Sequence, residues 1–304
     1  MNLADNVIGV SLCPVCKESQ FKVIGKPRVG HKADKVVKQD YKIVECNKCG
    51  FYYLSPKLEL TSEEWQILYD LEYFTPINDW HLKRRKNDLK KRFNKMQSLS
   101  DHKEIKYLDV GAGEGYGLIE AVNRGWETYG IDITDHRISE AKNIKLEFRQ
   151  ADLINANFPD NYFNFIYVDS VLEHVPNPME LLIELKRILY PGGIIYIGVP
   201  NENSLFTIIQ QIVFNVSGRA GESSRLKPFA SPFHIGGFTR NSLNHAIRNS
   251  GLSIVKIRNF ASKSDILNAR FLSRDFFIAV FYLPISLIAF PLRMEIYFEA
   301  YLTK

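Results

Sequence analysis

Four cysteines in two close pairs are the first residues whose spacing supports chemistry. Cys13 and Cys16 form one CxxC pair, and Cys46 and Cys49 form a second pair further along the chain. Each CxxC turn can direct two thiolates at one ion, so two such turns complete a closed tetrahedral site. The pattern therefore predicts a structural zinc ion without an open position for catalysis. The alternative is four reduced thiols in a β-hairpin.

A second chemical pattern is the run LDVGAGEGYG at 108–117, in which glycines alternate after an apolar stretch. The spacing predicts a buried strand before this loop, a helix after it, and then a second strand that ends at Asp132. Strand, glycine turn, helix, strand and acid form a nucleoside-binding unit, whose carboxylate binds ribose hydroxyls. Tyr116 stands where the dinucleotide fingerprint GxGxxG needs its third glycine, which argues against a nicotinamide cofactor.

The DxGxGxG form at 109–115 resembles motif I of class I S-adenosylmethionine-dependent methyltransferases, in the branch that modifies small molecules. The segments GIDITDHRISEAK, FRQADL, VDSVLEH and YPGGIIYIGVPN then follow in the family's order. The resemblance implies S-adenosylmethionine as the cofactor, with Asp109 near its amino group and Asp132 on its ribose. The implied cofactor-binding residues are Asp109, Gly111, Ala112, Gly113, Asp132, Ile133, Asp152, Leu153 and Asp169.

Two histidines are candidates for the methyl-transfer step, because a histidine can act as a base near neutral pH. His174 follows the expected fourth strand, and His234 lies in a segment that borders the acceptor pocket in the family the chain resembles. Either can instead be a structural histidine. Some relatives bind a divalent ion with an ExxEH pattern, so Asp169, Glu173, His174 and His234 are candidate ligands for magnesium. Ser170 stands where the first acid of that pattern belongs.

The chain has 304 residues, is 45% hydrophobic and 24% charged, and has a net charge of +5, which is ordinary for a globular protein. The resemblance implies an α/β fold with a doubly wound, seven-stranded, mostly parallel sheet, and several relatives carry an N-terminal zinc module. We expect a zinc-ribbon-like module at 1–58, a helical linker or cap at 59–103, the methyltransferase core at 104–262, an apolar helical flap at 263–292 and a final core strand at 293–304. Without a signal-like start, a cytoplasmic location is expected.

Two further segments bear on partners. The stretch 83–95 carries eight Lys and Arg residues, which either form a solvated helix face or contact a phosphate-bearing substrate or lipid headgroup. The stretch 276–292 has no charged residue. It is expected to pack as a flap or to dip into one leaflet of a membrane, as a peripheral contact; the alternative is a buried hairpin or dimer face.

The expected reaction is O-methylation of a small molecule, a sugar or a lipid-linked compound. The segment VDSVLEH replaces the N/D-P-P-Y motif of enzymes that methylate amines in nucleic acids, so a nucleic-acid acceptor is not expected. The alternatives are carbon methylation of a nucleotide sugar, methylation of ribosomal RNA, and a cofactor-binding module without catalysis. The oligomeric state is left open.

Overall fold

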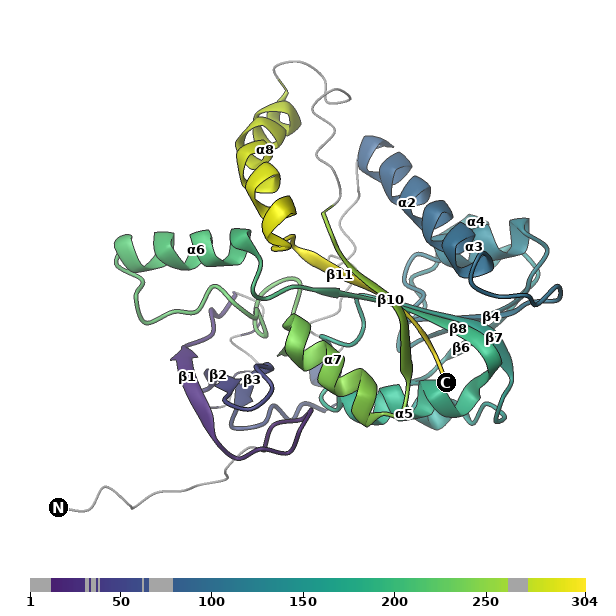
Figure 1. Cartoon of the computed structure of the whole chain (residues 1–304), viewed down its shortest axis with the longest axis horizontal. Coiled ribbons are helices and arrows are strands. Elements are labelled where there is room, and N and C mark those ends of the chain that lie inside the picture. Colours follow the sequence, from purple (N-terminus) through teal and green to yellow (C-terminus); the bar gives the residue numbers. More distant parts are fainter. Residues whose placement is uncertain are drawn as a thin grey trace.

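The computed structural model describes residues 12–30, 33, 37, 39–61, 63–65, 79–261 and 273–304. Seven strands form one sheet in the order β10-β11-β8-β7-β4-β5-β6 (Figure 1). Their bounds are β4 (Lys106–Val110), β5 (Glu127–Asp132), β6 (Glu147–Gln150), β7 (Phe163–Asp169), β8 (Leu189–Pro200), β10 (Ser253–Phe260) and β11 (Tyr297–Thr303). Neighbouring strands pair in parallel from β8 to β6, and β11 runs antiparallel between β8 and β10. The predicted α/β fold with a mostly parallel seven-stranded sheet is confirmed.

Helices cover both faces of this sheet (Figure 1). One face carries α2 (Asp79–Gln97), α3 (Tyr116–Asn123) and α4 (Ser139–Lys142), and the other carries α5 (Pro178–Ile188) and α7 (Arg240–Asn249). The strand β7 is buried at six of its seven positions, as expected for a parallel strand covered on both sides. Leu89, Phe93 and Met96 give α2 a buried apolar face at helical spacing. The basic stretch 83–95 therefore lies on α2, which packs its apolar face against the core.

The N-terminal module is a small antiparallel sheet of β1 (Phe21–Gly25), β2 (Lys42–Cys46) and β3 (Tyr52–Ser55). A fourth strand, β9 (Gly236–Gly237), comes from the core and pairs with β3. Apolar residues of the module, among them Ile43 and Tyr52, share a buried cluster with Phe229 and Phe233 of the core. The module is thus joined to the core by both backbone pairing and packing.

Two apolar helices, α6 (Leu205–Val216) and α8 (Arg274–Leu292), project from the edge of the layered core (Figure 1). The expected apolar flap at 263–292 includes α8, while 263–272 lie outside the described residues. No helix in the described part of the chain is long and apolar enough to cross a membrane.

Candidate active site

The four cysteines converge in the N-terminal module. The Sγ atoms of Cys13 and Cys49 are 3.6 Å apart, and those of Cys16 and Cys46 are 3.4 Å apart. These separations exceed the S–S bond of about 2.05 Å in a disulfide. They lie close to the edge of a tetrahedron built on Zn–S bonds, about 3.8 Å when each bond is about 2.3 Å. The two turns that carry the pairs therefore bring four sulfurs together as a tetrahedral metal site requires.

The glycine loop follows β4 at the carboxyl edge of the sheet, where open α/β sheets bind ligands. Gly111 has a φ of +73°, and an added Cβ there would overlap the side chain of Val171. The N–H of Gly113 donates a 2.8 Å hydrogen bond to Oδ2 of Asp132 at the end of β5. The loop is therefore held against the second strand through the carboxylate that the sequence assigns to ribose.

Asp109 lies beneath this loop, buried and next to the start of α3. A Cβ at Gly117 would overlap its Oδ2 atom, so the fourth glycine of the run leaves room for this carboxylate. Burial raises the pKa of Asp109 to about 7, and the charges of Asp169 and Asp132 act in the same direction. A cation bound nearby would favour the ionised form, which fits the predicted contact with the amino group of the cofactor.

The residues expected on the nucleoside side lie along the ends of β5 and β6. Oδ1 of Asp132 accepts a 3.1 Å hydrogen bond from the N–H of Thr134, and burial raises the pKa of Asp132. Ile133 is exposed, whereas Leu153 is buried in the core. Asp152 accepts hydrogen bonds from both the backbone and the side-chain nitrogen of Asn155. Asp132, Ile133 and Asp152 thus follow consecutive parallel strands, as a bound nucleoside requires.

Asp169 ends β7 and is engaged in a network that the sequence did not reveal. Its Oδ2 accepts a 2.7 Å ion-pair contact from Nη1 of Arg92, and its Oδ1 accepts a 2.8 Å hydrogen bond from the hydroxyl of Tyr297. Arg92 also pairs with Oε1 of the buried Glu299 at 2.7 Å. Nε of Arg258 donates to the other oxygen of Glu299. The network ties α2 and β7 to the antiparallel edge of the sheet.

A second potential metal-ligand group lies directly after β7. Glu173, His174 and His234 each offer one ligating atom, and these atoms lie within 4.8 Å of one another. Glu173 is fully buried, and neither of its carboxylate oxygens has a hydrogen-bond partner among the described residues. Burial raises the pKa of Glu173 well above its usual value and lowers that of His174 to about 4. Burial also lowers the pKa of His234 well below its usual value, which favours the neutral imidazoles that bind metals, whereas the raised pKa of Glu173 favours its protonated form until a cation binds.

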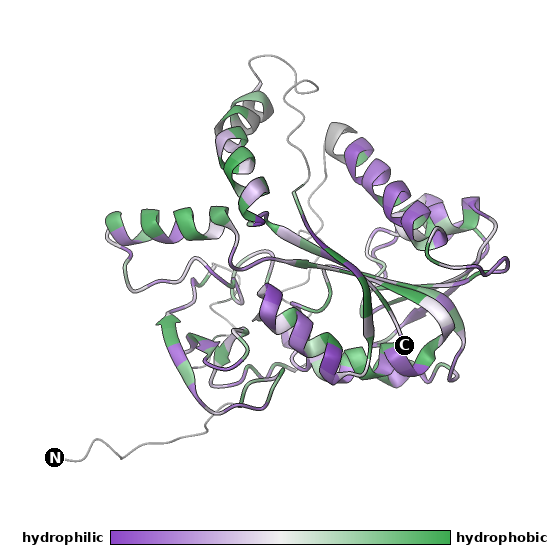
Figure 2. Cartoon of the chain, viewed as in Figure 1, coloured by the Kyte–Doolittle hydropathy of each residue, from purple (hydrophilic) through white to green (hydrophobic). Residues whose placement is uncertain are grey.

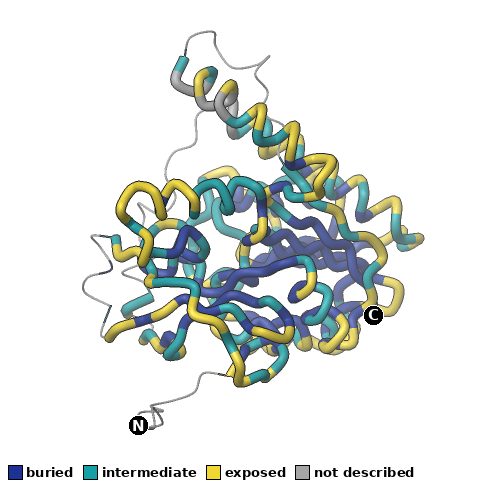
Figure 3. Tube along the Cα trace, turned by 60° about the vertical axis from the view of Figure 1, so that its left-hand side comes forward, coloured by how far each residue is buried: buried dark blue, intermediate teal, exposed yellow. Residues whose placement is uncertain are grey.

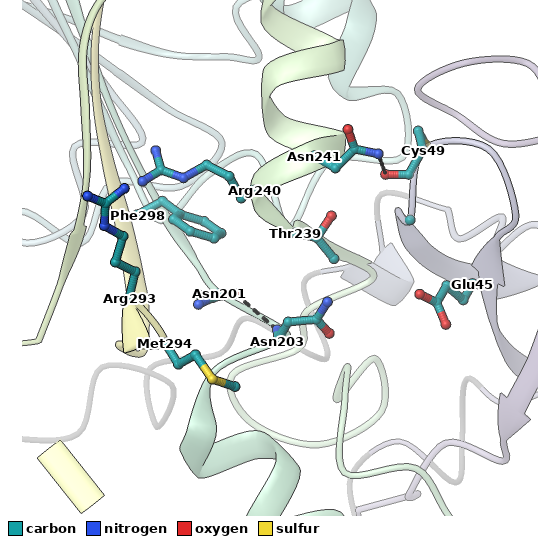
Figure 4. Close-up of a pocket in the computed structure, with 11 residues that line it drawn as sticks. Glu45, Cys49, Asn201, Asn203, Thr239, Arg240, Asn241, Arg293, Met294 and Phe298 are labelled. Atoms are coloured by element: carbon teal, nitrogen blue, oxygen red, sulfur yellow. Dashed lines mark hydrogen bonds between the residues drawn. The ribbon is translucent and has the colours of Figure 1, made fainter. Parts of the chain in front are cut away.

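A cavity of about 500 Å³ lies between the cysteine module, the end of β8 and the start of α7 (Figure 4). Arg240 and Arg293 occupy one side of it, and Glu45 lies on the opposite side (Figure 4). Nη2 of Arg240 donates to Asn259 at 2.8 Å, whereas its buried Nη1 has no hydrogen-bond partner in the described structure. Burial and the nearby charge of Arg293 lower the pKa of Arg240. The cavity offers hydrogen-bond donors to a polar or anionic group.

Similarity to known proteins identifies the family of the chain. A family model described as a methyltransferase domain matches residues 81–257, which is more than half of the chain. The chain belongs to the methyltransferase domain family. In this methyltransferase the matched region contains the glycine loop, Asp132, Asp169 and the Glu173–His174–His234 cluster.

Curated relatives match over shorter stretches. The chain is 33% identical over 99 residues to the sterol 24-C-methyltransferase of Gibberella zeae, covering 30% of this chain and 26% of that protein. It is 31% identical over 136 residues to the demethylmenaquinone methyltransferase of Geobacillus stearothermophilus, covering 41% of this chain and 58% of that protein. The chain thus spans between about a quarter and three fifths of these two relatives.

Solved structures support the fold of the methyltransferase. An S-adenosylmethionine-dependent methyltransferase from Archaeoglobus fulgidus superimposes with a TM-score of 0.51 at 20% identity, covering 75% of this chain and all of that one. The 1,6-didemethyltoxoflavin-N1-methyltransferase of Burkholderia thailandensis gives 0.52 at 11% identity, covering 88% and 97%. The fold is that of class I methyltransferases.

The structure brings together most of the residues that the sequence singled out. Asp109, Asp132 and Asp169 lie on three adjacent strands, and His174 and His234 have ring centroids 4.8 Å apart although they are distant in sequence. Arg92 was missed as an individual residue because it lies within a run of cations. Its place four residues after Asp88 and one before the buried Phe93 gives no signal that separates it from the neighbouring solvated cations.

Proposed function

We propose that this chain transfers a methyl group from S-adenosylmethionine to an oxygen atom of a small molecule, a sugar or a lipid-linked compound, with a divalent cation held by Glu173, His174 and His234. The observation that carries the proposal is the cluster of these three side chains after β7, in which both carboxylate oxygens of Glu173 are buried without a hydrogen-bond partner in the described structure. A buried ionised carboxylate is costly unless a charge, a metal or hydrogen bonds compensate for it, and without them the group takes up a proton. Among the described residues, the nearest group that can carry a positive charge is the imidazole of His234, whose Nε2 lies 3.9 Å from Oε1 of Glu173, so a bound cation would be what keeps Glu173 ionised.

The donor set favours one class of cation. Two imidazole nitrogens and one carboxylate suit iron, cobalt or zinc, whereas magnesium prefers oxygen ligands. Asp169, offered by the sequence as a further ligand, is bound by Arg92, Tyr167 and Tyr297 instead. We therefore propose a transition metal in place of the magnesium ion expected from the sequence.

One group of residues would bind S-adenosylmethionine, and another would position the acceptor. Bound S-adenosylmethionine supplies an activated methyl group, so the protein mainly has to position the acceptor. Asp132 would bind the ribose hydroxyls of the donor and Asp109 its ammonium group. As the oxygen–carbon bond forms, the sulfur–carbon bond breaks, S-adenosylhomocysteine leaves and the hydroxyl loses its proton. A cation held by Glu173, His174 and His234 would lower the pKa of a hydroxyl bound to it, so that the proton could pass to water. Without a cation His174 or His234 would have to accept this proton, and the lowered pKa of His174, about 4, makes it a weak base.

The cavity beside Arg240 is the proposed site for the polar part of the acceptor. It adjoins Asn201, which directly follows β8, and β8 pairs with β7 up to the level of Asp169. Asn201 is three residues past the Asp169 partner Gly198, about 10 Å along a strand. The separation between Asp169 and the cavity suits an acceptor molecule that reaches from one to the other. Its anionic or hydroxyl-rich end would bind in the cavity, and its reacting oxygen would lie near the end of β7.

A carbon acceptor is the second candidate, because one curated relative is named a sterol 24-C-methyltransferase. An RNA acceptor has less support, since two cations of the basic helix are engaged within the protein. Arg85 pairs with Glu114 of the glycine loop at 2.6 Å, and Arg92 pairs with Asp169. A cofactor-binding module without catalysis is also less supported, because it does not account for a buried Glu173 whose carboxyl oxygens have no hydrogen-bond partner in the described structure.

For the cysteines we propose structural zinc, supported by the sulfur separations and by the small size of the module. A sheet of three short strands has little core of its own, so a bound ion would supply much of its folding energy. All four thiolates would be used, which leaves no position for an acceptor.

Counting ions tests the metal proposal without relying on activity. Elemental analysis should find two metal ions per wild-type chain and one in Glu173→Gln. Glu202→Gln is the matched control, because Glu202 is also buried but lies outside the cluster, and it should retain two ions. In the cobalt-substituted protein, absorption bands from cobalt bound to thiolates report the cysteine site. Glu173→Gln should keep these bands and lose those of cobalt bound without thiolates. One ion in the wild type, or two in Glu173→Gln, would contradict the second site.

The acceptor is identified with methyl-labelled S-adenosylmethionine and a fractionated extract of the source cells. Label in the organic or sugar fraction supports a small molecule, and label in RNA contradicts it. Hydriodic acid cleaves methyl ethers but leaves carbon-bound methyl groups in place. Release of the label by this acid would therefore support oxygen as the methylated atom, and retention would favour carbon.

A further inference from the structure

The two helices that project from the core, α6 and α8, consist mostly of hydrophobic residues (Figure 2). They contact each other, and the ring centroids of Phe206 on α6 and Tyr282 on α8 are 5.3 Å apart. The sequence of α6 is LFTIIQQIVFNV, and α8 has no charged residue after Asp275. The surface therefore combines segments that are distant in sequence, and only the second of them stands out as an apolar run.

The projecting helices carry exposed positions (yellow in Figure 3). Exposed apolar side chains are concentrated on them. Ten of the nineteen large apolar side chains that are exposed in the described structure lie on them. Those ten are Ile212, Val213 and Val216 on α6 and Phe277, Val280, Leu283, Leu287, Ile288, Phe290 and Leu292 on α8. Exposed apolar side chains gathered on two neighbouring helices are typical of a surface that contacts a partner or a membrane.

The distribution around α8 distinguishes a membrane from a flat protein partner. At 100° per residue, its exposed apolar side chains span an arc of about 200°. The less exposed positions Tyr282, Ile285, Ser286 and Ala289 occupy the remaining side. A helix that packs on one protein face needs a stripe of roughly 100°. The wider arc suits an environment that surrounds the helix on several sides.

Cations lie at the ends of the two helices. The guanidinium groups of Arg219 and Arg28 lie 4.0 and 5.8 Å from the ring centroid of Phe214 on α6, and the exposed Arg293 is the C-cap of α8. Glu222 pairs with Arg219 and Arg28, so the rim keeps a net positive charge. Positive charge beside an apolar surface complements anionic lipid headgroups.

We propose that α6 and α8 together form a surface that binds the interfacial region of an anionic lipid bilayer. The helices would lie at the level of the headgroups and upper acyl chains, with Arg28, Arg219 and Arg293 toward the phosphates. The inference does not depend on the proposed reaction, although Arg293 also lines the cavity proposed for the acceptor. The sequence predicted a peripheral membrane contact through 276–292 alone, and the proposal adds α6 to that contact.

Vesicle flotation of the full chain tests the proposal, with three isoleucines as matched positions. Ile288 on α8 is 54% exposed, Ile212 on α6 is 55% exposed, and Ile183 on α5 is 53% exposed but lies outside the surface. The wild type should float with vesicles of phosphatidylcholine and phosphatidylglycerol. Ile288→Glu and Ile212→Glu should each lower the partition constant at least tenfold, whereas Ile183→Glu should leave it unchanged. Circular dichroism checks that each variant is folded.

Several results would overturn the inference. If the wild type does not float, the surface does not bind lipid; a dimer that Ile288→Glu converts to a monomer would then identify an interface between two copies. If Ile212→Glu binds like the wild type, α6 is not part of the surface. Equal binding to pure phosphatidylcholine vesicles, unaffected by Arg293→Gln, would contradict the role of the cations. Because these assays contain no donor or acceptor, their failure would leave the proposed reaction untouched.

Discussion

Replacing Asp109 by asparagine should change how the stability of the protein depends on pH. Asp109 is fully buried, and its carboxyl group has a pKa of about 7 in the folded state. In the unfolded chain the pKa is near 3.9. Between these values the folded state holds a proton that the unfolded state releases. The contribution of Asp109 to stability is therefore complete below about pH 4 and is lost as the pH rises to about 7.

The size of the effect follows from the two pKa values. A difference of about 3 pH units, at about 1.36 kcal/mol per unit, amounts to about 4 kcal/mol between pH 4 and pH 8. The amide that replaces the carboxyl group cannot ionise, so Asp109→Asn lacks this loss. Relative to the wild type, the variant should gain about 3 kcal/mol between pH 5 and pH 8, with most of the gain below pH 7.

Urea unfolding of both proteins without cofactor, at half-unit steps from pH 5 to pH 8, measures this difference. The titratable groups that face Asp109 are the neutral hydroxyl of Tyr107 on its own strand and the charged side chains of Asp132, Asp169 and Arg85. All four remain in both proteins, so their own titration largely cancels in the comparison. A difference in unfolding free energy that stays constant across this range would refute the assignment of the raised pKa to Asp109. If Asp109 binds the ammonium group of S-adenosylmethionine as proposed, the cofactor should bind the wild type more tightly as the pH rises to 7, because the carboxylate becomes ionised.

Three further predictions concern packing, the ion network and the cysteines. Gly117→Ala should lower the free energy of unfolding by about 1–3 kcal/mol, because its Cβ would overlap the Asp109 carboxylate, while Gly221→Ala, with nothing nearby, should be close to neutral by urea unfolding. Arg92→Met should cost about 3 kcal/mol in the same assay, because it removes one of the two cations paired with the buried Glu299 and the cation paired with the partly buried Asp169; an unchanged midpoint would contradict this. Cys46→Ser should abolish binding of one zinc ion per chain, measured by elemental analysis, and expose the module to proteolysis; full zinc content would exclude Cys46 as a ligand.

Local sequence signals were sufficient for the fold. The glycine run, the acid at the end of β5 and the order of the later segments carry a family resemblance that implies a doubly wound, mostly parallel seven-stranded sheet, and the structure has this sheet. The cysteine spacing likewise predicts the cluster of four sulfurs. These features depend on short segments whose chemistry requires particular residues. The cofactor and acceptor roles of individual residues stay predictions.

The remaining features depend on contacts between distant segments. Nothing near Arg92 shows that it faces Glu299, which follows more than 200 residues later. The pairing of Gly236 and Gly237 with β3 leaves no local pattern, because two glycines carry no alternating polarity. The exposure of α6 could not be read from its sequence either, since a buried helix has the same apolar composition.

The strand β9 has a consequence for how the two parts of the protein respond to each other. Gly236 pairs with Tyr53 of β3, while the backbone N–H groups of Ile235 and Gly236 both donate to the carbonyl oxygen of Glu173. One short segment is therefore shared by the cysteine module and by the loop that carries His234. Melting of the module would release this segment and separate His234 from Glu173. We therefore expect the two parts to unfold together, and an ion bound by the cysteines would also help to keep His234 beside Glu173.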